Sequence, residues 1–278
     1  NEKLFSLMDA LSRRSSGQTG VELPALREYP LPLPCKEEQT AIASALSDVD
    51  ALITSLEKLI AKKRAIKTAA MQQLLTGKKR LPPFDQNHTG YKQTELGEIP
   101  EDWEVDAIDN VVSITTGGRN TQDKVADGIY PFYVRSQTIE RINSYSFEGE
   151  GVLTAGDGVG TGKIFHYIDG KCDIHQRVYL MHNFSDRLHG YYFYIYFKNN
   201  FYNKVMSMTA KSSVDSVRRE MIADMSIILP SLEEQITISK VLSDMDVEIN
   251  TLEQRLNKTQ QLKQGMMQEL LTGRTRLI

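Results

Sequence analysis

The sequence predicts an α+β protein in which one globular domain is joined to two long helices that pair antiparallel. Three observations lead to this prediction. A segment of the chain is duplicated, each copy carries a heptad pattern of apolar residues, and short apolar runs alternate with turn residues between the copies. Heptad patterns are typical of coiled coils, and short apolar runs bounded by turn residues are typical of strands.

The duplicated segment begins at Leu33-Pro34 and again at Leu229-Pro230, 196 positions later. A Glu-Glu-Gln triplet, a Leu-Ser-Asp tripeptide and a Leu-Leu-Thr-Gly tetrapeptide follow in each copy at the same offset, without a gap. Two copies so far apart do not fit a solenoid, whose repeats are about 20–50 residues long. They indicate two structural units separated by a globular insert.

Each copy is predicted to form one long helix, over residues 33–77 and 231–278. An amphipathic helix of this length needs a partner for its apolar face, so we expect the copies to pack on each other rather than on separate domains. The expected pairing residues share alternating steps of four and three. They are Ile42, Leu46, Val49, Ile53, Leu56 and Ile60 in the first helix, and Ile238, Leu242, Met245, Ile249, Leu252 and Leu256 in the second.

The helix ends carry recognisable capping residues. Ser231 stands three residues before Glu234, which predicts a capping box, whereas Cys35 replaces the serine in the first copy and predicts a weaker cap. Gly77 and Gly273 are expected in the left-handed conformation after the last turn of each helix.

The insert is predicted to form one globular domain over residues 91–230, after a linker at residues 78–90 that contains Pro82, Pro83 and Gly90. A Tyr- and Phe-rich stretch over residues 188–208 is expected to be helical. The expected strands are the apolar runs at residues 111–114, 130–134, 151–153, 163–168 and 178–181.

Composition excludes several classes of protein. No apolar run approaches the ~18–20 residues of a membrane span, so no membrane association is expected. Two cysteines, Cys35 and Cys172, are too few for a disulfide framework and favour a reducing, cytoplasmic location. The net charge of −3 counts mildly against a nucleic-acid binder, although a basic face could coexist with that total.

The residues of several catalytic motifs are absent. The run Gly158–Lys163 resembles a phosphate loop, but Asp157 and Ile164 replace the first glycine and the hydroxyl residue that would bind magnesium. Leu81 stands where the Pro-Pro-aromatic motif of adenine methyltransferases needs a polar residue. His166, His175, His182 and His189 have no zinc-site spacing and are expected to be packing or surface groups. No catalytic residue, metal site or cofactor is therefore predicted.

The chain resembles the specificity subunits of Type I restriction–modification systems. The resemblance rests on a module that opens with Tyr91-Lys92, continues through Leu-Gly-Glu-Ile-Pro-Glu-Asp-Trp at 96–103, reaches Leu-Pro and Glu-Glu-Gln at 229–235, and closes on Leu-Leu-Thr-Gly at 270–273. In that family each such module is a target-recognition domain with a spacer helix, and each domain reads one half of a split DNA site. Residues 91–230 would then be a second target-recognition domain.

The resemblance also implies the partners: double-stranded DNA, methyltransferase subunits and, through the complex, restriction subunits. Shifted by 196 positions, Phe5, Ser16 and Val21 fall on Phe201, Ser212 and Val217, so residues 1–32 are interpreted as the end of a first recognition domain. The counterpart of Tyr91 would precede residue 1. We therefore expect about a hundred residues of that first domain to be lacking, which puts recognition of both half-sites by this chain in doubt.

Expected DNA contacts are Arg, Lys, Asn, Gln and hydroxyl residues in turns of the insert, because turns project side chains beyond the sheet. Arg135 and Arg177 are expected on bases, and Lys163 and Lys211 on phosphates. The full expected set is Arg119, Asn120, Arg135, Gln137, Lys163, Gln176, Arg177, Lys211 and Ser212.

Two other functions remain open at this stage. A truncated half-subunit could form a homodimer through its helices and read a symmetric site. A coiled-coil adaptor without DNA affinity is the alternative from another class. The charge of the insert and a salt-dependent DNA titration separate the adaptor from the DNA-binding alternatives.

Overall fold

The computed structural model describes residues 13–15, 18–20, 27, 33–86, 90–158, 160–208 and 216–277. The chain divides into two compact units, Asn1–Lys62 with Asn250–Ile278, and Lys63–Ile249. Both long helices contribute to both units. The first unit also contains a short antiparallel pair, β1 (Arg13–Ser15) and β2 (Gln18–Gly20).

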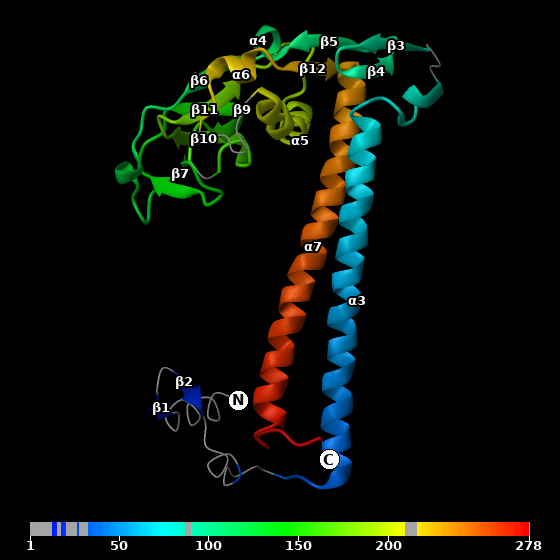
Figure 1. The fold of residues 1–278 in the computed structure, drawn as a ribbon, viewed down its shortest axis with the longest axis vertical. Helices are drawn as coiled ribbons and strands as arrows, with labels where there is room; N and C mark the ends of the chain where they lie inside the picture. Colours follow the sequence, from blue (N-terminus) through cyan, green and yellow to red (C-terminus); the bar gives the residue numbers. More distant parts are fainter. Residues whose placement is uncertain are drawn as a thin grey trace. The chain divides into compact units, whose positions relative to one another are not determined.

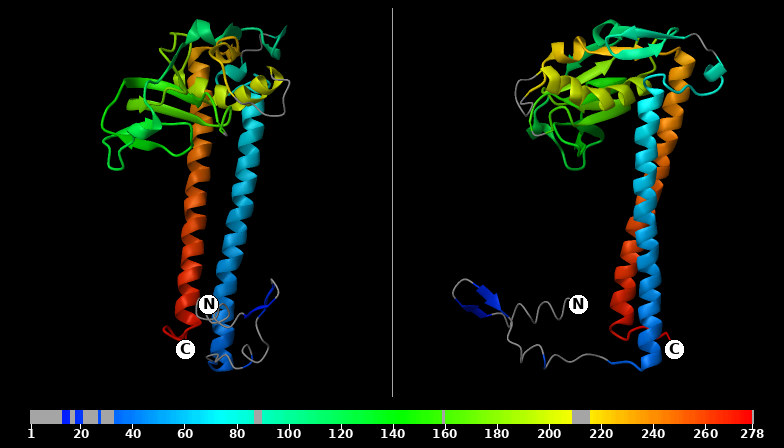
Figure 2. Two further views of the ribbon diagram at one scale, coloured as in Figure 1. Left: turned by 60° about the vertical axis from the view of Figure 1, so that its left-hand side comes forward. Right: turned by 45° about the vertical axis from the view of Figure 1, so that its right-hand side comes forward.

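The two long helices are α3 (Lys36–Leu74) and α7 (Leu232–Leu270), and they run side by side in Figures 1 and 2. In the first unit Asp50 pairs with Lys263, at 2.5 Å between Oδ1 and Nζ. In the second unit Lys63 pairs with Glu248, at 2.7 Å between Nζ and Oε1, and Lys67 pairs with Asp246. Partner numbers on α7 fall as those on α3 rise, which confirms the predicted antiparallel pairing.

The apolar faces of α3 and α7 are withdrawn from solvent. Of the twelve expected pairing residues, half are buried and the rest are half-buried. The buried ones are Ile42, Leu56, Ile60, Ile238, Leu242 and Ile249. Leu52 and Leu59, each one position before an expected pairing residue, are exposed instead. This alternation is what a heptad pattern predicts for the inner and outer faces of a paired helix.

The capping residues of the helices behave only partly as expected. Gly77 and Gly273 both have φ of +71°, as predicted for the left-handed position. The Ser231 hydroxyl accepts a hydrogen bond from the Glu234 N–H at 3.3 Å. A capping box would also have the Glu234 carboxylate accept from the Ser231 N–H. That carboxylate instead accepts from Arg80 and Trp103. Only one half of the capping box is formed.

A six-stranded sheet organises the domain between the helices. Its order is β6 (Ser113–Thr116), β11 (Val178–His182), β9 (Phe147–Ala155), β10 (Phe165–Ile174), β7 (Tyr130–Tyr133) and β8 (Glu140–Ile142). The β10–β7 pair is parallel and the other pairs are antiparallel. The mixture of this sheet with helices confirms the α+β prediction.

One expected strand is partly wrong. Residues 111–112 do not belong to a strand, because α4 (Ile108–Val111) ends there and β6 begins at Ser113. Ile108 and Val111 are both buried and lie three residues apart, on one face of this helical turn. A short apolar run cannot by itself separate a buried strand from a buried helical turn.

Smaller elements attach the domain to the helix ends (Figure 1). β3 (Tyr91–Thr94) and β4 (Gly97–Pro100) form a hairpin, and β5 (Glu104–Ala107) pairs with β12 (Ser226–Leu229). Two 3₁₀ turns, η1 (Phe84–Gln86) and η2 (Thr121–Asp123), and α6 (Arg219–Ala223) complete the described elements. The residues 78–90 expected as a linker contain η1 and the anchored Arg80.

The core of the domain forms where α5 (Gly190–Met208) packs on β9 and β10. Phe193, Phe197 and Phe201 stack along the helix at spacings of four residues, with ring centroids 5.4 and 4.4 Å apart. Phe165 of β10 meets Phe197 edge-on at 5.6 Å. This aromatic core holds the sheet in place, so the loops at the strand ends project from a rigid base. No described helix is both long and apolar enough for a membrane span.

Candidate nucleic-acid interface

The ends of β6, β9 and β10 and the start of β11 are joined by main-chain hydrogen bonds at one end of the sheet. After β6, the Arg119 N–H donates to the Ile174 carbonyl at 3.2 Å, and the Gln176 N–H donates to the Arg119 carbonyl at 2.8 Å. The Gly156 N–H, after β9, donates to the Arg177 carbonyl at 2.8 Å. The end of β7 joins them, because the His175 N–H donates to the Tyr133 carbonyl at 3.0 Å. The polar side chains that follow these strand ends form what we call the polar cluster: Arg119, Asn120, Arg135, Asp157, Gln176 and Arg177.

Glycine permits the approach of two of these strand ends. A Cβ placed on Gly117 would lie 1.9 Å from the Ile174 carbonyl oxygen, a distance that no side chain allows. Gly117 therefore lets the loop that carries Arg119 and Asn120 lie directly against the end of β10. The position of the polar cluster depends on this close approach.

Asp157 joins two arginines of the polar cluster. Its Oδ1 accepts from Arg135 Nη1 at 2.8 Å and its Oδ2 from Arg177 Nη1 at 2.5 Å. Burial would raise the pKa of the Asp157 carboxyl, but the hydrogen bonds from Arg135 and Arg177 outweigh it and lower that pKa. Both guanidinium groups stay exposed. Each arginine is therefore held by one nitrogen and keeps other N–H groups for an outside acceptor.

Arg119 is fixed by a buried carboxylate. Its Nε donates to Asp173 Oδ2 at 3.0 Å, and Ser144 and Ser146 each donate a hydroxyl to Asp173 at 2.7 Å. Burial alone would raise the pKa of Asp173, but these hydrogen bonds lower it overall. A fully buried, ionised carboxylate with this many donors makes a rigid anchor. The Arg119 side chain remains half exposed beyond it.

Asn120 and Gln176 add an amide pair to the polar cluster. Gln176 Nε2 donates to Asn120 Oδ1 at 2.6 Å, and both residues are exposed. An amide can donate and accept at once, which is the pattern that reads an adenine edge in the major groove. The hydrogen bond between the two amides restricts the orientation of both side chains.

His175 contacts the polar cluster through the backbone of Arg177. It is buried, and its Nδ1 accepts from the Arg177 N–H at 3.0 Å. Burial lowers its pKa below 6.5, and the positive charge of Arg135 lowers it further. The imidazole is therefore neutral at pH 7 and acts as an acceptor that orients the Arg177 backbone.

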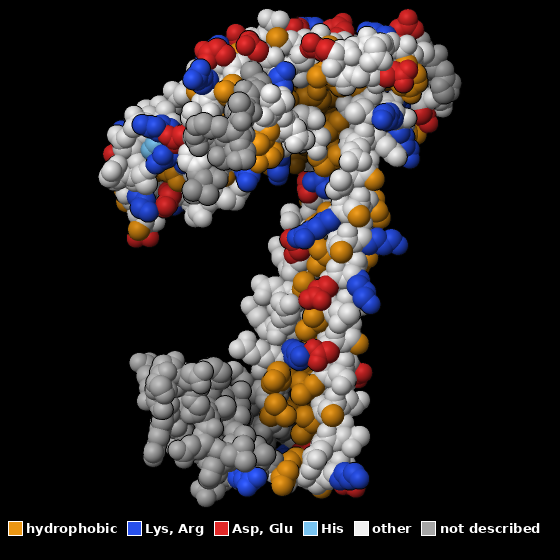
Figure 3. All heavy atoms as spheres, viewed as in Figure 1, with side chains coloured by type: hydrophobic (Ala, Val, Ile, Leu, Met, Phe, Trp, Pro, Cys, Tyr) orange, Lys and Arg blue, Asp and Glu red, His pale blue; other side chains and the backbone are white. Residues whose placement is uncertain are grey.

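A shallow pocket of about 210 Å³ is lined by two members of the polar cluster, Gln176 and Arg177. Its other lining residues are Thr116, Gly156, Asp157, Tyr179, Ser216 and Val217. On the face drawn in Figure 3, basic and acidic side chains mingle over the part of the domain near β7. A surface of alternating donors and acceptors suits base edges better than a uniformly basic one, which suits phosphates.

The remaining expected DNA contacts lie apart from these links. Lys163 is exposed and stands over the Tyr202 ring of α5, 5.2 Å from its centroid. Gln137 is exposed in the loop after β7. Lys211 and Ser212 lie outside the described residues. The structure thus links five of the nine expected residues through side-chain or main-chain bonds.

Sequence reasoning missed the carboxylates of this site. In the sequence Asp157 stands out only because it breaks a phosphate loop, and Asp173 lies in Lys171-Cys172-Asp173-Ile174, which matches no motif. Neither aspartate has an arginine or a serine beside it in the sequence. Nothing in a single sequence shows which arginine meets which carboxylate.

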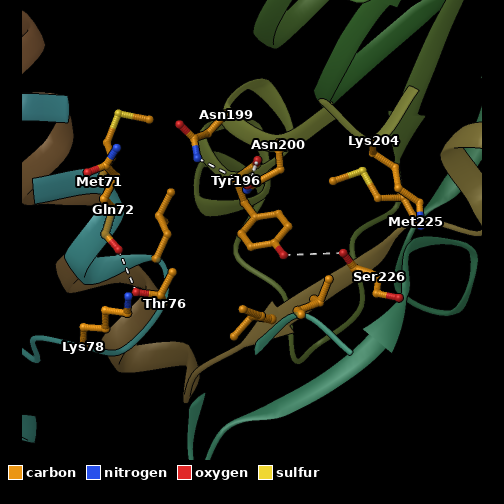
Figure 4. A pocket seen from close by; sticks show the side chains of 13 residues that line it. Met71, Gln72, Thr76, Lys78, Tyr196, Asn199, Asn200, Lys204, Met225 and Ser226 are labelled. Atoms are coloured by element: carbon orange, nitrogen blue, oxygen red, sulfur yellow. Dashed lines mark hydrogen bonds between the residues drawn. The ribbon is translucent and has the colours of Figure 1, made fainter. Parts of the chain in front are cut away.

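A larger pocket of about 480 Å³ lies elsewhere in the same unit, between the end of α3, α5 and β12 (Figure 4). The Tyr196 hydroxyl donates to the Ser226 carbonyl at its base, at 3.5 Å. Its lining contains Lys78 and Lys204 together with amides and apolar side chains, and no acid, histidine or cysteine. Among the described residues no group of three or more metal-ligating side chains occurs.

The model of the Type I restriction modification DNA specificity domain matches residues 4–67 and 100–264, which is more than half of the chain. The chain belongs to this family.

The chain is similar to two curated specificity subunits. The Type I restriction enzyme EcoDI specificity subunit of Escherichia coli is 27% identical over 176 residues, which cover 63% of this chain and 38% of that protein. The MjaVIII specificity subunit of Methanocaldococcus jannaschii is 28% identical over 287 residues, which cover 95% of this chain and 66% of that protein. The chain thus spans less than two thirds of either relative's length.

Solved structures show the same fold. The S subunit of a Type I restriction–modification system from M. genitalium superposes with a TM-score of 0.68 at 15% identity, over 97% of this chain and 70% of that one. A chain from a structural study of complex assembly and conformational transition of the Type I system superposes with a TM-score of 0.57 at 16% identity, over 96% of this chain and 67% of that one.

Proposed function

We propose that this chain recognises a DNA sequence and directs the methyltransferase and restriction subunits of a Type I restriction–modification complex to it. Membership of the specificity family supports the general role. The single observation that carries the proposal at residue level is the polar cluster, in which two exposed arginines converge on Asp157 beside the Asn120–Gln176 amide pair.

The polar cluster suits base reading because its side chains are fixed before DNA arrives. Side chains that are already ordered lose less conformational entropy when they bind, and they reject partners whose donors and acceptors do not match. Arg135 and Arg177 offer N–H groups for guanine O6 and N7, and Asn120 and Gln176 can address adenine. Lys163, Gln137, Lys211 and Ser212 are proposed as outer contacts, with the two lysines on phosphates.

The proposed role is non-catalytic. The lining of the larger pocket contains no acid, histidine or cysteine. The phosphate-loop motif is broken at Asp157, where it needs a glycine, and at Ile164, where it needs a hydroxyl residue, and the methyltransferase motif is broken at Leu81, where it needs a polar residue. In this proposal the methyl donor and ATP are bound by the partner subunits. The chain alone is expected to transfer no methyl group, hydrolyse no ATP and cleave no DNA, and to act in the cytoplasm, where its DNA and partners are.

Alanine substitutions at Arg119, Arg135, Lys163, Arg177 and Lys211 test the proposal, each titrated against the preferred duplex and a scrambled one at two salt concentrations. Loss of a bidentate arginine–guanine pair is expected to cost about 1–3 kcal/mol on the preferred duplex only. Loss of a phosphate contact is expected to weaken both duplexes alike and to lower the salt slope by about one.

Arg187→Ala is the matched control. Arg187 is also an exposed arginine of the same unit held by two carboxylates, Glu104 and Asp106, each at 2.7 Å, but it contacts no member of the polar cluster. The Arg187→Ala substitution also removes one positive charge. Its effect on DNA affinity therefore measures how much the loss of a charge alone, away from the polar cluster, weakens binding. If all five variants bind both duplexes as the control does, the DNA surface lies elsewhere. No DNA binding by the folded chain with its partners would favour the adaptor alternative.

A further inference from the structure

The turn that leads into β7 presents an isoleucine to solvent. The Ile129 side chain is 67% exposed, and among the described large apolar side chains only Leu33 is more exposed. A single exposed apolar residue is ordinary on a protein surface and needs no explanation by itself. Ile129 differs from such a residue because the backbone around it is fixed at several points.

Hydrogen bonds hold the backbone on both sides of the Ile129 side chain. Its N–H donates to Asn143 Oδ1 at 3.3 Å, and its carbonyl accepts from Arg141 Nη2 at 2.8 Å. Arg141 Nε also donates to the Gly128 carbonyl at 3.0 Å. One guanidinium group thus fixes two successive carbonyls of the turn. These bonds use only backbone groups of Ile129, which any residue except proline would supply. The turn therefore does not need an isoleucine for its own stability.

The turn is also packed directly on the edge strand β8. Gly128 is buried, and a Cβ placed on it would lie 2.4 Å from the backbone nitrogen of Ile142. The Gly128 N–H donates to the Val125 carbonyl at 3.0 Å, and the Val125 N–H donates to the Arg141 carbonyl at 2.8 Å. A backbone held in this way keeps the Ile129 side chain in solvent until another molecule covers it.

Two consecutive residues join this turn to the polar cluster. Asn143 accepts from the Ile129 N–H, and Ser144 Oγ accepts from Arg119 Nη2 at 3.1 Å while it donates to Asp173. Consecutive Cα atoms are about 3.8 Å apart. The exposed arginine and the exposed isoleucine are therefore positioned by one short segment of chain. A duplex that contacts Arg119 passes close to Ile129.

An aromatic ring and an ammonium group stand beside the turn. Tyr130 follows Ile129, and its ring centroid lies 5.0 Å from that of Tyr145, which is 44% exposed. Lys171 Nζ lies 4.6 Å from the Tyr145 ring centroid and pairs loosely with Glu148, at 3.6 Å. An exposed ring next to a lysine suits the sugar and phosphate groups of a nucleic-acid backbone.

We propose that Ile129 inserts between two neighbouring base pairs of the bound duplex, beside the bases that the polar cluster contacts. This inference rests on the proposed function and adds a contact that senses how easily a base step unstacks. Apolar side chains that enter a base step partly unstack it and kink the duplex. Pyrimidine–purine steps deform most easily, so the preferred sequence is expected to carry a TA or CA/TG step at this place. Tyr145 and Lys171 then lie along the adjacent sugar–phosphate backbone.

The probe is a duplex that the chain selects together with its methyltransferase subunits, with 2-aminopurine placed at one position at a time. This base analogue fluoresces more strongly when it is unstacked, so binding is expected to brighten one position. Ile129→Ala is expected to abolish that rise and to weaken binding about tenfold, because the step loses its apolar contact. Ile129→Leu is expected to keep the rise, since leucine also unstacks base steps in this way.

Leu96→Ala is the matched control. Leu96 is also an exposed apolar residue of the same unit, at 39%, but it lies in the turn of the separate β3–β4 hairpin. This variant is expected to bind as the unchanged chain does. A mismatched pair at the brightened step lowers the cost of unstacking. The mismatch is therefore expected to strengthen binding by the unchanged chain but not by Ile129→Ala.

Two results overturn the inference while the proposed function stands. One is selective binding without any brightened position, and the other is an Ile129→Ala variant that binds the duplex as Leu96→Ala does. Loss of assembly with the methyltransferase subunits in Ile129→Ala, with unchanged fluorescence of the bound duplex, would instead assign Ile129 to a protein contact. If the assembled complex selects no sequence, the proposed function and this inference fail together. Ile129→Ala is expected to fold normally, because the side chain is exposed and the turn is held by the backbone.

Discussion

The carboxylate of Asp157 holds two arginine side chains that would otherwise move freely at the surface. It shares one oxygen with each, at 2.8 and 2.5 Å, and keeps both in front of the sheet edge. It also cancels part of their charge, which reduces attraction to phosphates of any sequence. If the polar cluster reads DNA as proposed, Asp157 both positions the two arginines and limits their attraction to DNA of any sequence.

Asp157→Asn separates these two effects. Asparagine keeps the size but loses the charge and one acceptor oxygen, so Arg135 and Arg177 are released. Affinity for scrambled DNA is expected to rise, with a steeper salt dependence, while the ratio of preferred to scrambled affinity falls about tenfold. The measurement is a titration of both duplexes at two salt concentrations. An unchanged ratio would show that Asp157 does not position the arginines for reading.

The buried histidines predict a pH dependence of stability. Burial lowers the pKa of His166 and of His175 below 6.5. The unfolded chain therefore binds protons near pH 6 that the folded chain does not, so stability is full above pH 6.5 and falls as the pH drops through the lowered values. The slope contributed by each histidine is at most about 1.4 kcal/mol per pH unit.

Thermal unfolding between pH 7.5 and 5 measures this slope. His175→Gln, which keeps a neutral acceptor, is expected to unfold with a shallower pH dependence than the wild type. Asp157 and Asp173 do not interfere, because their pKa values are lowered from 3.8 and lie below this range. A stability that rises towards pH 5 would contradict the assignment of neutral, buried histidines.

The paired helices repeat their charge contacts as well as their apolar face. Asp50 with Lys263, and Asp246 with Lys67, are the same pair shifted by 196 positions, as are Glu38 with Arg276 and Glu234 with Arg80. The two Asp–Lys pairs are partly exposed, and such pairs contribute little stability, about 0–1 kcal/mol each. The two Glu–Arg pairs differ, because Glu38 and Glu234 are buried. The regular placement of these pairs instead favours one antiparallel register, because a shift of one helix along the other separates the opposite charges that now pair.

The apolar face is expected to supply the stability of the helix pair. Leu56 is buried between the helices and Leu52, one turn before it on the same helix, is exposed. Leu56→Ala is expected to lower the free energy of unfolding by about 2–5 kcal/mol because it leaves a cavity. Leu52→Ala, the control, is expected to change it by less than about 0.5 kcal/mol. Urea unfolding compares them, and equal midpoints would argue against pairing through the predicted face.

The helices and most strands were predictable from the sequence because their patterns are local. Alternating apolar steps placed the helices within a few residues of α3 and α7, and β-prone runs anticipated β7, β9, β10 and β11. The β5–β12 pair was not predicted, since it joins residues 104–107 to 226–229 across the whole domain. Long-range pairing has no signature in a local pattern. For the same reason the sequence indicated the arginines of the polar cluster but not the carboxylates that hold them.

At the scale of the whole molecule, the chain spans 66% of one curated relative and 38% of another. It contains one sheet-based domain with a polar cluster, among the residues that the structure describes. If this domain reads DNA as proposed, the described residues account for one half-site.

The most direct test is selection of bound DNA from a random duplex pool by the purified chain together with the methyltransferase subunits of its own system. The proposed function predicts that one short sequence is enriched over successive rounds, and that Arg135→Ala or Arg177→Ala relaxes the preference at particular positions while leaving the others unchanged. Recovery of the input distribution by a folded, assembled complex, with no enriched sequence, would contradict the claim that this chain reads DNA.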